Sequence, residues 1–84
     1  MDLNELKNRN YQATVKRGLI TSKTSKYDFI AKQLEEIHEW IEHPKDPSEC
    51  ADVILVMLAY CKHYKINIQL ALEQKTIYNE NRKD

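Results

Sequence analysis

The sequence predicts an all-α protein in which four helices form a single domain across residues 1–84. Residues that interrupt helices are scarce, with one Gly and two Pro, and the hydrophobic content of 42% is typical of a globular chain. Apolar residues recur at helical spacing between residues 30 and 41. Ser25, Asp46 and Asn67, which are residue types that cap helix starts, precede the second, third and fourth helical segments. These observations favour a four-helix bundle.

The first helix is expected over residues 3–17. Gly18 suits the position just beyond a helix end, and two basic residues in the last turn complement the helix dipole. The stripe expected to face inward is narrow and consists of Leu3, Leu6, Asn10 and Ala13.

The second helix is expected to begin after Ser25, because Asp28 follows three residues later in a capping-box-like pattern. Glu36 and Glu39 fall on a different face from its apolar stripe, so one interpretation leaves both carboxylates in solvent. The stripe has 4-3-4 spacing and consists of Ile30, Leu34, Ile37 and Ile41.

A short connection, residues 43–46, joins the second and third helices, which are therefore expected to be antiparallel neighbours. Glu39 stands near the end of one helix and Glu49 near the start of the next. The turn would bring both to the same end of the bundle, which argues against the solvent interpretation of the first acidic pair.

The third helix has Asp46 as its predicted N-cap and Pro47 at its first position. Glu49 has two interpretations, as a metal ligand or as the far member of a capping box. Residues 51–61 are almost entirely apolar, which is typical of a buried helix. Asp52 is therefore expected to be a buried carboxylate, and such a group is normally paired or metal-bound.

The fourth helix is expected over residues 68–82, with Asn67 as its cap. One stripe begins apolar and becomes polar toward its end, which indicates either phosphate contacts at the mouth of the bundle or a solvated C-terminus. The stripe consists of Ile68, Leu72, Lys75, Asn79 and Arg82.

The candidate functional residues of the sequence are two acidic pairs, Glu36-x-x-Glu39 and Glu49-x-x-Asp52. Each spacing places both carboxylates on one face of a helix. Four facing carboxylates are better explained by a divalent cation than by stability, because like charges repel. An all-oxygen ligand set suits Mg²⁺ or Mn²⁺ rather than Zn²⁺.

Charge and cysteine content exclude several classes of protein. The formal net charge is zero, so bulk electrostatics indicate neither nucleic acid nor membrane as a partner. No signal peptide or bilayer-length apolar run is visible. Cys50 and Cys61 match no zinc spacing and are expected to be plain buried thiols. These features favour a cytoplasmic protein.

The histidines and aromatic residues receive no assigned role. We expect His38, His43 and His63 to lie on the surface. Aromatic side chains could stack on a nucleotide base, although core or interface packing is their commoner use; the candidates are Tyr11, Tyr27 and Trp40.

The combined pattern resembles the MazG-like all-α nucleoside triphosphate pyrophosphohydrolases. It is similar above all to their phage-associated dATP/dGTP pyrophosphohydrolase subgroup. The resemblance covers residues 27–82 and rests on LEEI at 34–37, PKDPSECADVIL at 44–55, ALEQK at 71–75 and NENR at 79–82. Where the subgroup commonly has Arg and Gly after the third helix, this chain reads CKHYK at 61–65, which leaves the choice of base open.

The resemblance implies a Mg²⁺-dependent hydrolase that cuts a nucleoside triphosphate between its α- and β-phosphates. It implies that Glu36 or Glu39 orients the attacking water. The implied metal ligands are Glu36, Glu39, Glu49 and Asp52, and the implied phosphate contacts are Lys75, Asn79 and Arg82.

A third helix that is apolar on every side cannot be covered by one 84-residue chain. The sequence therefore predicts a homo-oligomer, a dimer or tetramer, with the second and third helices at its interface. Two other classes remain open: a catalytically inactive helical interaction module, and a small regulator whose acidic patch binds a basic partner.

Overall fold

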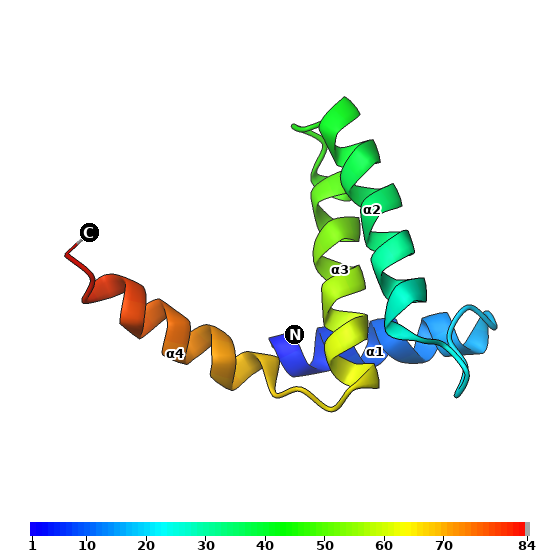
Figure 1. Ribbon diagram of the computed structural model, residues 1–84, viewed down its shortest axis with the longest axis horizontal. Coiled ribbons are helices and arrows are strands. Elements are labelled where there is room, and N and C mark those ends of the chain that lie inside the picture. Colours follow the sequence, from blue (N-terminus) through cyan, green and yellow to red (C-terminus); the bar gives the residue numbers. More distant parts are fainter. Residues whose placement is uncertain (84) are drawn as a thin grey trace.

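The computed structural model describes residues 1–83 as four α-helices joined by short loops (Figure 1). The all-α prediction is confirmed, and this part of the chain contains no strand. No helix within it is long and apolar enough to cross a bilayer. The helices are α1 (Leu3–Lys16), α2 (Lys26–Glu42), α3 (Pro47–His63) and α4 (Ile68–Glu80).

The helix ends follow from local hydrogen bonds. The Ser25 N–H donates to Asp28 Oδ2 over 2.8 Å at the start of α2, and the Leu70 N–H donates to Asn67 Oδ1 over 3.1 Å in α4. Gly18 has φ +77° just after α1, a conformation that favours glycine. The predicted starts are confirmed, whereas the first helix ends one residue and the fourth two residues earlier than expected.

The helices do not close into a four-helix bundle within one chain. α2 and α3 form an antiparallel hairpin, and α1 packs across α3 at the base of that hairpin (Figure 1). α4 makes no comparable contact with the other helices and extends away from them. The radius of gyration is 14.3 Å. A compact domain of this length would have about 12 Å, so the single chain is open.

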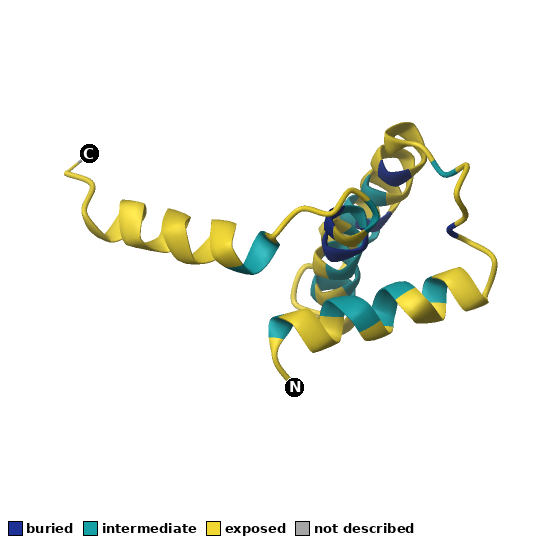
Figure 2. Ribbon diagram, turned by 90° about the horizontal axis from the view of Figure 1, so that it is seen from below, coloured by how far each residue is buried: buried dark blue, intermediate teal, exposed yellow. Residues whose placement is uncertain are grey.

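The core is small and lies where α2 and α3 meet near the loop that follows α1 (Figure 2). Five apolar residues are buried: Ile20, Phe29, Leu58, Ala59 and Cys61. The single chain leaves one side of α3 uncovered, as expected for a chain of this length, with Ile54 58% exposed and Met57 48% exposed.

The faces of the other helices differ from expectation. The apolar stripe of α2 points mostly outward, with Leu34 62% exposed, because Phe29 and Glu36 on the adjacent face of the helix take the buried positions against α3. Gln33 assists by donating to the Val53 carbonyl over 3.0 Å. Besides Leu34, the exposed apolar members of the expected stripes are Leu6 and Ala13 in α1, Ile30 and Ile41 in α2, and Leu72 in α4.

His63 is not a surface residue, contrary to expectation. Its Nε2 lies 3.0 Å from the Thr24 carbonyl, and its Nδ1 lies 2.9 Å from the Tyr11 hydroxyl. A carbonyl only accepts, so the Nε2–H donates to Thr24 and neutral His63 accepts from Tyr11 at Nδ1. The imidazole thus joins α3, α1 and the loop before α2, and it contacts Phe29 with ring centroids 5.1 Å apart.

Tyr11→Phe is expected to lower the free energy of unfolding by about 1 to 2 kcal/mol, because it removes the hydroxyl donor and leaves Nδ1 of half-buried His63 unsatisfied. Chemical denaturation of the purified protein measures the change. Tyr27→Phe is the matched control, because Tyr27 is 70% exposed and should tolerate the same change. Equal stability of both variants and the parent would contradict this role of His63.

Candidate functional site

Three carboxylates from α2 and α3 converge near the turn that joins these helices. Glu36, Glu49 and Asp52 each offer an oxygen, and these oxygens all lie within 4.8 Å of one another. The antiparallel packing of α2 against α3 brings them together, as the short turn suggested. We call these three residues the acidic cluster.

Glu36 is the buried member of the acidic cluster. It is only 7% exposed, so the interpretation that left it in solvent is wrong. Its Oε1 lies 3.0 Å from Lys32 Nζ, while its Oε2 is buried and has no hydrogen-bond partner. An unsatisfied oxygen on a buried anion is costly, and a cation would relieve that cost.

Glu49 does not take part in the predicted capping box. The Asp46 N–H, which such a box would direct to Glu49, instead donates to the His43 carbonyl over 3.1 Å. Asp46 itself caps α3 by accepting from the Ser48 N–H over 2.8 Å. Glu49 Oε2 is buried and has no hydrogen-bond partner. The carboxylate is thus available to a ligand.

The electrostatics of the site are repulsive. Desolvation raises the pKa of Glu49, and the charges of Glu39, Asp46, Asp52 and Glu36 raise it further. Glu39 is half-buried and lies outside the acidic cluster, yet it is close enough to disfavour ionisation of Glu49. Asp52 is half-buried rather than buried as expected, because its side of α3 is only partly covered.

Glu49→Gln should stabilise the metal-free protein, and increasingly so as pH rises. The folded-state pKa of Glu49 lies above its ordinary value of 4.5, so the folded state binds the proton more tightly than the unfolded state. The resulting penalty is absent below that ordinary pKa and grows as pH rises through the raised one. Melts of parent and variant in EDTA from pH 4 to 8 test the sign, with exposed Glu5→Gln as control. A gain that shrinks with rising pH would contradict it.

A cavity of about 440 Å³ lies beside the acidic cluster, between α1, α2 and α3. Glu36 and Asp52 line one part of it, and the aliphatic side chains of Ile20, Leu55 and Val56 supply apolar wall. Two basic residues also line it, Arg17 and Lys32. Neither was assigned to the site from the sequence, although Lys32 stands one helical turn before Glu36.

The predicted phosphate contacts are not brought to this cavity within one chain. Lys75 and Asn79 lie on α4, and Arg82 follows it, on the helix that extends away from the hairpin (Figure 1). The described lining of the cavity includes none of the three. Lys75 and Arg82 lie instead near Tyr78, with Lys75 Nζ 4.6 Å and Arg82 Cζ 6.0 Å from its ring centroid, and the Arg82 guanidinium donates to Asn79 Oδ1 over 3.5 Å.

The remaining candidates are placed as follows. His38 is exposed and lies 3.2 Å from Glu42, and His43 is exposed, as expected. Tyr11 packs against the core. Tyr27 is exposed and Trp40 is 39% exposed, and neither of these two rings lines the 440 Å³ cavity. Cys61 is buried as expected, whereas Cys50 is only half-buried.

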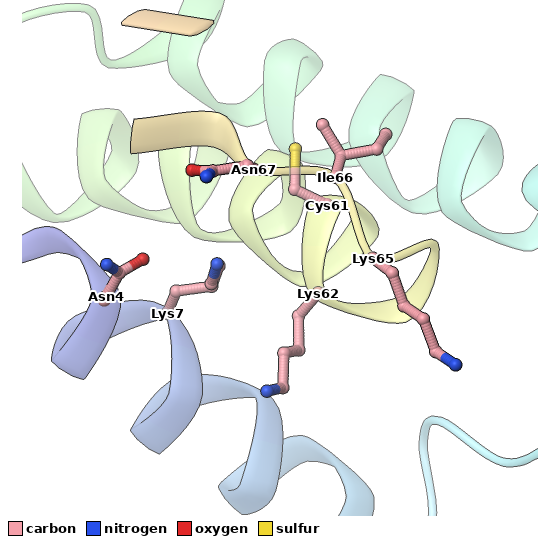
Figure 3. A pocket seen from close by; sticks show the side chains of 7 residues that line it. All are labelled: Asn4, Lys7, Cys61, Lys62, Lys65, Ile66 and Asn67. Carbon is pink, nitrogen blue, oxygen red and sulfur yellow. The ribbon is translucent and has the colours of Figure 1, made fainter. Parts of the chain in front are cut away.

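A second cavity, of about 350 Å³, lies between α1 and the segment joining α3 to α4 (Figure 3). Three lysines line it, yet Lys62 and Lys65 point in different directions away from Lys7. Burial raises the pKa of the Cys61 thiol there, an effect that the charge of Lys7 partly offsets. The diverging ammonium groups and the protonated thiol form no convergent site.

Comparisons of the chain with protein-family models, curated proteins and solved structures find no match. The resemblance to the MazG-like group therefore rests on the sequence motifs alone. The geometry of the acidic cluster is an independent property of the fold.

Proposed function

We propose that this chain is a Mg²⁺-dependent nucleoside triphosphate pyrophosphohydrolase, which hydrolyses the bond between the α- and β-phosphates and releases a nucleoside monophosphate and pyrophosphate. The observation that carries the proposal is the acidic cluster, in which Glu36 and Glu49 each hold a buried oxygen without a hydrogen-bond partner. Such oxygens suit a hard divalent cation. The motif resemblance supplies the reaction, and dATP and dGTP are the candidate substrates that it favours.

The residues have separate roles in this proposal. Glu36, Glu49 and Asp52 hold Mg²⁺ or Mn²⁺, with Glu39 as a further ligand. When bound, the ion supplies charge neutralisation on the phosphate and a lower pKa for water. Glu36 or Glu39 orients the attacking water toward the α-phosphorus.

The proposal includes a homo-oligomer, a dimer or tetramer, with α2 and α3 at the interface. In this proposal a second copy of the chain covers the outward apolar face. The stripe of α2 and the exposed side of α3 form one apolar groove there, in which the second copy would bury apolar side chains. The groove is lined by Phe29, Ile30, Leu34, Val56, Met57 and Tyr60, together with the stems of Lys26 and Gln33. Lys75, Asn79 and Arg82 contact phosphate if α4 folds back or reaches the cavity of another copy.

The experiment is a screen of all ribo- and deoxyribonucleoside triphosphates with Mg²⁺, which assays pyrophosphate and orthophosphate separately. We expect pyrophosphate and the monophosphate in equal amounts, no orthophosphate, and no reaction in EDTA. Orthophosphate as the product would contradict cleavage at the α–β position. No hydrolysis of any nucleotide, with Mg²⁺ or Mn²⁺, would contradict the enzymatic function.

A catalytically inactive helical interaction or regulatory module is the alternative. The position of α4 favours it, since the three predicted phosphate contacts lie outside the cavity of their own chain. A regulator that binds a basic partner through the acidic cluster needs no cation. Stabilisation by millimolar Mg²⁺ would argue against that regulator, and pyrophosphate release would exclude both alternatives.

A further inference from the structure

Lys32 forms an ion pair that helix geometry alone does not favour. Its Nζ lies 3.0 Å from Glu36 Oε1 and 3.5 Å from Glu35 Oε1. The order Lys then Glu at i, i+4 is the weaker orientation on a helix, because it opposes the helix dipole. The side chain of Lys32 is 51% exposed and that of Glu36 only 9% exposed. The ion pair therefore offsets the charge of the buried Glu36 carboxylate rather than stabilising the exposed surface of α2.

The charge balance of the site shows what Lys32 does there. Within residues 1–83, Lys32 is the only basic side chain within ion-pair distance of the acidic cluster, so one positive charge faces three carboxylates. The hydrogen bond to Glu36 raises the pKa of Lys32, which keeps its ammonium charged. A divalent cation at Glu36 would repel that ammonium at close range. Lys32 at Oε1 and a cation at the unpartnered Oε2 would therefore compete to neutralise the same Glu36 carboxylate.

The cavity offers the ammonium group of Lys32 a second binding partner besides Glu36. It lines the 440 Å³ cavity together with Glu36, Asp52 and Arg17. Besides these two basic residues no other Lys or Arg lines the described walls of the cavity. The lysine stem is flexible and its ammonium is a good point-charge partner for phosphate. A polyphosphate that enters beside the acidic cluster would meet both cations.

We propose that Lys32 is a phosphate-binding residue that neutralises Glu36 in the metal-free protein, and that Mg²⁺ displaces its ammonium toward the polyphosphate in the cavity, with Arg17 as the second cation. This inference rests on the proposed function. It places two phosphate contacts within the cavity of the single chain, Lys32 on α2 and Arg17 at the end of α1, in addition to those expected from α4.

The test uses Lys32→Gln and two binding probes that need no turnover. The first probe is Mg²⁺ alone, titrated against the melting temperature. Removal of the competing charge should destabilise the metal-free protein and lower the Mg²⁺ concentration for half-maximal stabilisation about tenfold. The second probe is inorganic pyrophosphate at saturating Mg²⁺, measured by calorimetry, which the variant should bind about tenfold more weakly. A merely structural lysine would not move these two affinities in opposite directions.

Two further variants complete the design. Lys32→Arg keeps the charge and should restore pyrophosphate binding, whereas Lys16→Gln removes one exposed charge outside the cavity and should change neither affinity. An unchanged Mg²⁺ midpoint or unchanged pyrophosphate affinity in Lys32→Gln overturns the inference, as does a parent that binds no pyrophosphate. Nucleotide hydrolysis by the parent is scored separately. The role of Lys32 can therefore be refuted while nucleotide hydrolysis is observed, and hydrolysis can be absent while the role of Lys32 in binding is supported.

Discussion

Asp52→Asn is expected to abolish nucleotide hydrolysis while the metal-free protein keeps or gains stability. The change preserves the shape of the side chain and removes one charge from the acidic cluster, so repulsion with Glu36 and Glu49 falls. Changes to residues that only support a metal ligand cost about 10- to 100-fold. Loss of a direct ligand should therefore lower kcat/KM by more than about a hundredfold.

The metal dependence of stability provides the second readout for Asp52. Mg²⁺ at a hundred times its dissociation constant should stabilise the parent by about 2.7 kcal/mol, and this gain should collapse in the variant. Melts of parent and variant with and without Mg²⁺ measure it. Glu5→Gln is the control, because Glu5 is an exposed acid on α1 outside the acidic cluster.

A structural Asp52 predicts the reverse pattern. If its carboxylate held the fold through charged hydrogen bonds, the Asn variant would lose about 1.5 to 3 kcal/mol without metal. Among residues 1–83, however, no hydrogen bond or ion pair holds the Asp52 side chain. A variant that is destabilised without metal and hydrolyses nucleotide at the parent rate would refute the catalytic role of the whole acidic cluster.

Local sequence was sufficient to predict the helices, because their ends depend on short-range hydrogen bonds. Ser25 with Asp28, and Asn67 with the start of α4, act over three residues and are readable without tertiary structure. The turn after α2 likewise predicted that the acidic pairs would meet. Helix direction places Glu36 and Glu49 at the same end of the hairpin, whereas the face of α2 that meets α3 decides that Glu36 rather than Glu39 joins the acidic cluster.

The burial of individual faces could not be predicted, because it depends on which of two apolar faces meets α3. The regular stripe of α2 includes Leu34, yet the single chain buries the face of Phe29 and Glu36. The spacing of apolar residues identifies the face of a helix that they share, but not the helix that packs against that face. The role of His63 was missed for a related reason, since its partners Tyr11 and Thr24 lie 52 and 39 residues away in sequence.

Leu34→Asp is expected to convert the proposed oligomer into a monomer. Leu34 is 62% exposed at the centre of the outward stripe of α2, and it lines the apolar groove with Ile30 and Met57. A buried leucine contributes about 1.5 to 3 kcal/mol, and a charge in an apolar interface adds a desolvation cost. In a symmetric dimer the change occurs twice. The dissociation constant should therefore rise by more than about a hundredfold.

Light scattering and sedimentation at micromolar concentration measure this change. Val15→Asp is the matched control, because Val15 is 44% exposed on α1 and does not line the groove, so the variant should remain oligomeric. The melting temperature of the parent should also rise with protein concentration, because association stabilises only the folded chain. A parent that is monomeric at micromolar concentration, with a melting temperature independent of concentration, would refute the oligomer. The outward face of α2 would then need a different partner.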